Sequence, residues 1–151
     1  MSHTPPYHLH DAIGYQLTVT ARLQERRFEA ALKTIGLTRI TWCVLLAVGD
    51  ETLRHPSAIA SFIGIDRTAA SRALRQMEGD GLIVRDGGTA DKRTTRVSLT
   101  KTGAEKLANA APLAAESRAT IEAKLPPDDL AHLRRLLARL REDDDTPLTR
   151  L

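Results

Sequence analysis

The sequence has a single cysteine, Cys43, and only 3% aromatic residues among its 151 residues. One cysteine cannot form an internal disulfide or a metal site built on a cysteine pair. With so few aromatic side chains, the 42% hydrophobic content must come mainly from Leu, Ile, Val and Ala. That content is still enough for the core of one domain, or of one domain with long packing helices.

Long apolar runs and targeting signals are also lacking. No apolar run is long enough to span a bilayer. The N-terminus, residues 1–8, has neither the charged start nor the apolar centre of a signal peptide. We therefore expect a cytoplasmic protein that does not associate with membranes.

A catalytic constellation is not visible. An enzyme needs a nucleophile, a base or metal ligands that converge, and His55 and His132 have no evident partner in the sequence. Gly87 and Gly88 fall in an expected hairpin, not between a strand and a helix, so they do not form a phosphate-binding loop. The sequence therefore predicts that the protein is not an enzyme.

Metal and redox chemistry are weakly indicated. His8, His10 and Asp11 include zinc-ligand types, but a zinc site normally takes four ligands and no matching set follows. Cys43 would need an accessible, electropositive surrounding to act as a redox sensor, and it lies in an apolar run beside Trp42. We expect no metal, no cofactor and an inert, buried Cys43.

The small net charge of +3 is unevenly distributed along the chain. Between Asp66 and Gly103 there are eight basic and five acidic residues, whereas basic and acidic residues balance in the rest of the chain. A local surplus of positive charge attracts phosphate more effectively than total charge does. This segment is therefore the candidate for contact with nucleic acid.

The spacing of apolar residues predicts a mainly helical chain. Gly36 and Gly49 are stop signals, and Thr38, Asp66 and Thr100 are cap candidates. Pro112 should interrupt and kink the fifth helix. The expected helices cover residues 9–35, 39–48, 56–63, 67–80, 101–125 and 127–140.

A helix-turn-helix followed by a hairpin is predicted in the middle of the chain. The helices 56–63 and 67–80 are joined by a short turn that contains Gly64. Alternating residues predict strands over 82–85 and 95–99, with glycines in the turn between them. Together these elements outline a winged helix-turn-helix.

The motifs around this hairpin resemble the MarR family (multiple-antibiotic-resistance regulators). That family carries Asp-x-Arg at the wing, here Asp91 and Arg93, and then Leu-Thr-x-x-Gly, here Leu99, Thr100 and Gly103. The resemblance implies a mainly α fold with a small β-hairpin wing. It divides the chain into an N-terminal dimerisation helix (9–36), a winged helix-turn-helix (37–103) and C-terminal dimerisation helices (104–142), with flexible ends at 1–8 and 143–151.

The fourth helix would enter the major groove of DNA. Ala70, Ala73, Leu74 and Met77 form its inner face. Arg72 or Arg75 would pair with guanine, Thr68 and Ser71 would reach a base or a phosphate, and Arg67 would contact phosphate. The alternative for each single arginine is an ordinary solvated side chain.

The wing would contact the neighbouring part of the duplex. By resemblance, Arg93 enters the minor groove, where a narrow groove attracts arginine, and Asp91 orients it. Lys92 and Arg96 would contact phosphates, which position a protein without specifying sequence.

The terminal helices carry the remaining predictions. A leucine stripe from Leu130 to Leu140 must be buried, either within the chain or in a homodimer, and the resemblance favours the homodimer. Relatives hold a small aromatic or anionic effector near such helices. Candidate residues are Tyr15, Arg22 and Trp42, although the two aromatic residues are better explained as ordinary core and edge side chains.

The resulting interpretation is a ligand-responsive, homodimeric repressor that binds a pseudo-palindromic operator in double-stranded DNA. The alternative is a dimeric module of the same fold that binds a small molecule or a protein and no longer binds DNA. Arg93 and the local basic surplus argue against this alternative.

Overall fold

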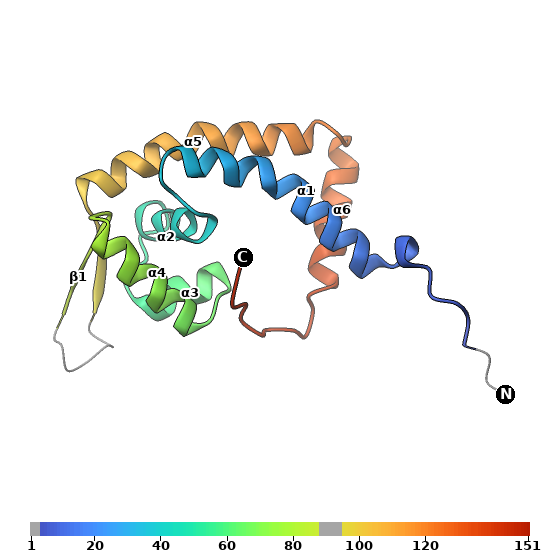
Figure 1. The fold of residues 1–151 in the computed structure, drawn as a ribbon, viewed down its shortest axis with the longest axis horizontal. Helices are drawn as coiled ribbons and strands as arrows, with labels where there is room; N and C mark the ends of the chain where they lie inside the picture. Colours follow the sequence, from blue (N-terminus) through green and yellow to red (C-terminus); the bar gives the residue numbers. More distant parts are fainter. Residues whose placement is uncertain (1–3, 88–94) are drawn as a thin grey trace.

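The computed structural model describes residues 4–87 and 95–151 (Figure 1). These residues form six α-helices and one antiparallel pair of strands. In chain order they are a 3-10 turn η1 (Leu9–Asp11), α1 (Ile13–Thr34), α2 (Arg39–Gly49), α3 (Pro56–Ile63), α4 (Arg67–Gly79), β1 (Ile83–Asp86), β2 (Arg96–Leu99), α5 (Lys101–Glu122) and α6 (Pro127–Arg139). The predicted fold class, mainly α with a small hairpin wing, is confirmed.

Two layers are visible in Figure 1. The long helices α1 and α5 run side by side along the top, and α2, α3, α4 and the hairpin lie beneath one end of them. Helix α6 descends from the opposite end, and the chain after it returns toward α3. The helix-turn-helix and the hairpin therefore face away from α5.

The core lies between the two layers. Helix α2 is buried along most of its length, and Val44, Leu45 and Val48 have no exposed surface. Phe28 and Leu32 of α1 pack on it from above, while side chains of α3, α4 and both strands close it from below. The core therefore fixes the position of α4 relative to the long helices.

Short side-chain caps explain why α2 and α4 begin where the sequence predicts. Thr38 and Thr41 form a reciprocal capping box at the start of α2. The Asp66 carboxylate accepts a hydrogen bond of 2.7 Å from the Ala69 N–H at the start of α4. These interactions involve residues three apart in sequence, so the sequence alone could reveal them.

Two predicted helices differ from the structure. The first helix does not begin at Leu9, because Ala12 is extended between η1 and α1. Helix α5 is not interrupted at Pro112, and it ends at Glu122 rather than near Leu125. Proline removes one helical N–H donor, but the carbonyl left without that donor belongs to Ala108, which is exposed and open to water.

In the described part of the chain, no single helix is long and apolar enough to cross a membrane. The consecutive helices α1 and α2 are long and apolar enough only when taken together, and they are bent by 74° relative to each other. Helix α2 belongs to the core described above.

Candidate nucleic-acid interface

The turn between α3 and α4 sets the angle at which α4 is presented. Gly64 ends α3 with φ of 84°, a left-handed conformation that glycine adopts without strain. The Ala60 carbonyl accepts hydrogen bonds from the N–H groups of both Gly64 and Ile65. Asp66 then caps α4 directly, so the helix-turn-helix is held by local hydrogen bonds.

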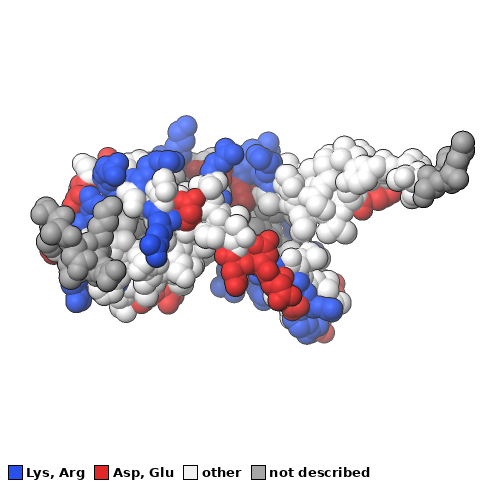
Figure 2. Space-filling view, turned by 90° about the horizontal axis from the view of Figure 1, so that it is seen from below, with Lys and Arg blue, Asp and Glu red and all other residues white. Residues whose placement is uncertain are grey.

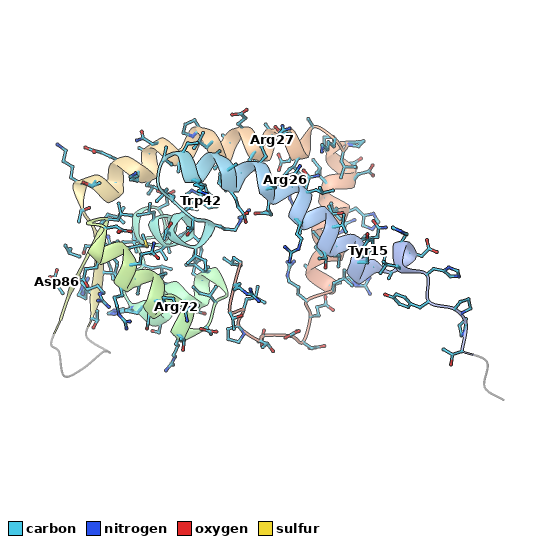
Figure 3. All side chains as sticks on the ribbon, in the orientation of Figure 1. Tyr15, Arg26, Arg27, Trp42, Arg72 and Asp86 are labelled. Carbon is cyan, nitrogen blue, oxygen red and sulfur yellow. The ribbon has the colours of Figure 1, made fainter. Side chains whose placement is uncertain are left out.

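Helix α4 separates into an inner and an outer face, as the sequence predicts. Ala70, Ala73, Leu74 and Met77 are buried. The predicted DNA-contacting residues are all exposed along the outer face, and they are Arg67, Thr68, Ser71, Arg72 and Arg75. In Figure 3, Arg72 lies on the opposite side of the molecule from α5. The structure thus brings these five side chains onto one accessible helix surface.

Gln76 is also exposed on this helix, although it is not among the DNA-contacting residues predicted from the sequence. A glutamine amide can pair bidentately with adenine in the major groove. The position of Gln76 next to Arg75 is the feature of the sequence that could have identified it as a candidate DNA contact. Figure 2 looks onto this side of the molecule, which is the lower side in Figure 1.

Arg85 has a structural partner, although it counts toward the basic surplus of the sequence. Its guanidinium, on β1, donates to one Glu78 carboxylate oxygen of α4 from Nε at 3.0 Å and from a terminal nitrogen at 2.5 Å. The hydrogen bond from Arg85 lowers the pKa of the Glu78 carboxyl, and the positive charge of Arg85 adds to this effect. This pair connects α4 to the hairpin and leaves less free positive charge for DNA than the residue count suggests.

The base of the wing is well defined. Strands β1 and β2 pair in antiparallel register, with Ile83 opposite Leu99 and Asp86 opposite Arg96. Arg96 is exposed. The Val97 N–H of β2 also donates to the Arg54 carbonyl at 2.7 Å, so the segment before α3 lies against the hairpin. No local pattern in the sequence indicates this long-range contact.

The predicted wing residues Asp91, Lys92 and Arg93 lie outside the described residues. Their roles at the minor groove and at phosphates therefore stay predictions.

The Leu99-Thr100-x-x-Gly103 motif has a physical explanation in the structure. The Thr100 hydroxyl oxygen accepts from the Gly103 N–H at 3.0 Å, which caps α5, and the hydroxyl donates to the Gly81 carbonyl at 2.6 Å. A Cβ on Gly103 would lie 2.0 Å from the carbonyl oxygen of Leu82. The motif thus joins the end of α4, the hairpin and the start of α5 at one point.

A second feature lies between the long helices and the DNA-facing unit. The rings of Phe28 and Trp42 meet edge to face with centroids 4.8 Å apart. The Arg39 guanidinium lies 5.4 Å from the Phe28 centroid and 6.0 Å from that of Trp42, and it pairs with Glu25. These four side chains, together with residues of α5, line a cleft of about 280 Å³, which we call the aromatic cleft.

The other predicted effector residues do not line this cleft. Tyr15 packs edge-on against His10 near the start of α1, far from Trp42 in Figure 3. Arg22 is exposed on α1. Conversely, Phe28 and Arg39 were not selected from the sequence. A Phe-containing helix followed by an Arg near a Trp is too common a pattern to identify a site.

Cys43 is partly buried next to Trp42. Burial raises the pKa of its thiol, although the positive charge of Arg39 opposes this shift. A thiol with a raised pKa is a poor nucleophile at neutral pH. Within residues 4–87 and 95–151, no three His, Cys, Asp or Glu side chains come together around a metal-sized site.

Comparison with known proteins agrees with this arrangement. The sequence pattern of the MarR family matches residues 35–94, which include α2, α3, α4 and β1. A protein of Thauera aromatica assigned to the regulation of the hcr operon is 29% identical over 137 residues, which cover 89% of this chain and 82% of the relative.

Two solved structures extend the comparison. The transcriptional repressor CouR bound to a 23-mer DNA duplex is 26% identical with a TM-score of 0.77, over 93% of this chain and 100% of CouR. BpsR of Bordetella bronchiseptica, whose DNA binding is regulated by 6-hydroxynicotinic acid, has a TM-score of 0.82 at 21% identity, over 93% of this chain and 100% of BpsR.

Proposed function

Because the chain belongs to the MarR family and is a DNA-binding transcriptional regulator, we propose that two copies of it bind a pseudo-palindromic operator and repress transcription. The observation that carries the proposal is the row of exposed polar and basic side chains on α4, from Arg67 to Arg75. Two-fold dimers commonly bind operators with two such helices in successive major grooves. Such a regulator works beside the chromosome, in the bacterial cytoplasm.

Each of the five exposed residues of α4 that we predict to contact DNA has a proposed role that follows from its position. Arg72 and Arg75, in the middle of the exposed face, pair with base edges, whereas Arg67 at the helix start contacts a phosphate. Thr68 and Ser71 reach a base or a phosphate between them. In the wing, Arg93 enters the minor groove with Asp91 orienting it, and Lys92 and Arg96 contact phosphates.

The homodimer is supported by apolar surface that the single chain leaves uncovered. Helix α6 has no buried residue, and Leu133, Leu136 and Leu140 of the predicted leucine stripe are exposed. Ile13 and Leu23 of α1 are exposed as well. Contiguous apolar surface of this kind marks protein interfaces, so we assign residues 9–36 and 104–142 to the dimer interface.

We assign the aromatic cleft to a small aromatic anion. Trp42, beside the nearly buried Phe28, offers ring surface to an aromatic effector, and the Arg39 guanidinium, which pairs with Glu25 in this structure, is the charge for which an effector carboxylate would compete. The Nε of Arg39 is buried without a hydrogen-bond partner in the described part of the protein. BpsR, of similar fold, responds to 6-hydroxynicotinic acid, an effector of this chemical class.

The effector would release DNA by changing the spacing of the two α4 helices. The cleft lies between α1, α2 and α5, and α2 supports the helix-turn-helix from above. Release requires that the effector bind the DNA-free arrangement more tightly than the DNA-bound one.

The DNA-binding role of α4 is tested with Arg72→Ala and Arg75→Ala on operator DNA at fixed salt. Each variant should lose about 1–3 kcal/mol of affinity for the operator, with less change on a scrambled duplex. Arg27→Ala, which removes the same charge from α1 on the opposite side of the molecule (Figure 3), is the matched control. Because Arg27 lies in a segment assigned to the dimer interface, light scattering first checks that this variant is a dimer, and the dimeric variant should bind normally. Equal losses in all three variants would contradict base contact by α4.

The effector site is tested through Trp42, which is the only tryptophan of the chain. Adding 6-hydroxynicotinic acid or benzoate should change the Trp42 fluorescence saturably and lower operator affinity. Arg39→Gln should weaken the saturable change while keeping the dimer intact. A fluorescence response that is unaffected by Arg39→Gln would place the effector elsewhere.

A further inference from the structure

The chain after α6 does not end freely but returns to the helix-turn-helix (Figure 1). We call residues 142–151 the acidic tail. Leu148 forms a parallel bridge with Ile65. The Leu148 N–H donates to the Gly64 carbonyl at 2.8 Å, and the Leu148 carbonyl accepts from the Asp66 N–H at 2.8 Å. The tail is thus attached to the turn that positions α4.

The attachment places negative charge beside the DNA-facing surface. The tail begins with four acids, Glu142 to Asp145, all of them exposed. Asp144 and Asp145 line a cleft of about 1120 Å³ together with Ser57, Ser61 and Arg67. Figure 2, which views the molecule from the α3 and α4 side, shows a cluster of acidic side chains on that face.

Operator phosphates would have to approach the same place. Exposed hydroxyl and basic side chains at the starts of α3 and α4, such as Ser57 and Arg67, are of the types that contact phosphate. Carboxylates within a Debye length, about 8 Å at physiological salt, repel an approaching phosphate and compete for Arg67. A docked tail therefore lowers DNA affinity, and a displaced tail does not.

The attachment is shallow enough to be reversible. It consists of two backbone hydrogen bonds, and the Leu148 side chain that accompanies them stays 53% exposed. Segments held by few buried contacts open at low cost in free energy.

From these observations we propose that the acidic tail is a built-in brake. It docks on the α3–α4 turn of its own chain, places carboxylates on the same cleft as Arg67 and weakens operator binding until it is displaced. This goes beyond the assigned repressor function and adds a control that needs no effector.

The first test removes the charge and keeps the attachment. D144N/D145N is compared with D50N/E51Q, which removes two exposed acidic charges at the end of α2, outside α4, the tail and the segments assigned to the dimer interface, so both variants have the same net charge. The tail variant should bind operator DNA roughly three- to tenfold more tightly than the control at low salt, with the difference shrinking as salt rises. Equal affinities of the two variants would overturn the brake.

The second test removes the attachment and keeps the charge. Leu148→Pro lacks the N–H that donates to Gly64. It should bind DNA more tightly than wild type and lose the amide-exchange protection of Asp66, with an unchanged dimer by light scattering. Weaker DNA binding would instead make the tail a structural support and would overturn the proposal. If wild type and every variant failed to bind the operator, the repressor function would fail together with the brake.

Discussion

Gly103 lies where the fold leaves no room for a side chain. Helix α5 starts so close to β1 that the Leu82 carbonyl occupies the place of a side chain. The sequence identified Gly103 as part of a family motif, but the atom that excludes a side chain lies more than twenty positions earlier and only the fold brings it there.

Gly103→Ala should destabilise the protein by about 2–3 kcal/mol, because the obstructing atom is backbone and cannot rotate away. Gly79→Ala is the control, since a Cβ at Gly79 meets nothing within 4 Å. It should be neutral or slightly stabilising, because alanine is the better helix former. Chemical unfolding of both variants measures the difference, and an unaffected Gly103→Ala would contradict the packing described here.

The residues proposed to bind the effector could be predicted from the sequence only in part. Trp42 was selectable because it is the only tryptophan of the chain. Phe28 and Arg39 become relevant only because α1 folds over α2 and brings both side chains to Trp42. Tyr15 had an equal claim in the sequence, yet it lies at the other end of α1.

At the scale of elements, the helices are the part that the sequence predicts best. Caps and stop signals such as Thr38, Gly64 and Asp66 act within four residues, so helices α2, α3 and α4 could be delimited closely. Contacts between distant segments could not be predicted. The pairing of Val97 with Arg54 and the ion pair of Arg85 with Glu78 both depend on the folded arrangement.

The Glu78–Arg85 pair is expected to hold the hairpin at a fixed angle to α4. Glu78→Gln should reduce operator affinity modestly while leaving the helices intact. Because the folded-state pKa of Glu78 is lowered, the pair contributes stability above the ordinary glutamate pKa and loses it as the pH falls through the folded value.

Urea unfolding of wild type and Glu78→Gln at pH 7 and near pH 3 tests this expectation. The wild type should be the more stable protein at pH 7, and the two midpoints should converge at the acidic pH. Identical midpoints at pH 7 would show that the pair is only a surface contact.

At the scale of the whole molecule, the surface proposed to bind DNA and the apolar surface proposed to form the dimer lie on different helices. Exposed basic and hydroxyl side chains gather on α4, and uncovered leucines gather on α6. The sequence predicted both surfaces from local surplus charge and from the leucine stripe. It gave no indication that the acidic tail returns to the helix-turn-helix, because a single backbone bridge at Leu148 leaves no periodic pattern.

As a whole, the molecule is proposed to bind one operator specifically. Fluorescence anisotropy of the purified protein on DNA from upstream of its own gene, with a scrambled duplex beside it, tests this most directly over several salt concentrations. We expect tighter binding to the native duplex, and a preference that survives moderate salt because base contacts add to phosphate contacts. Equal, weak and steeply salt-dependent binding to both duplexes would contradict it.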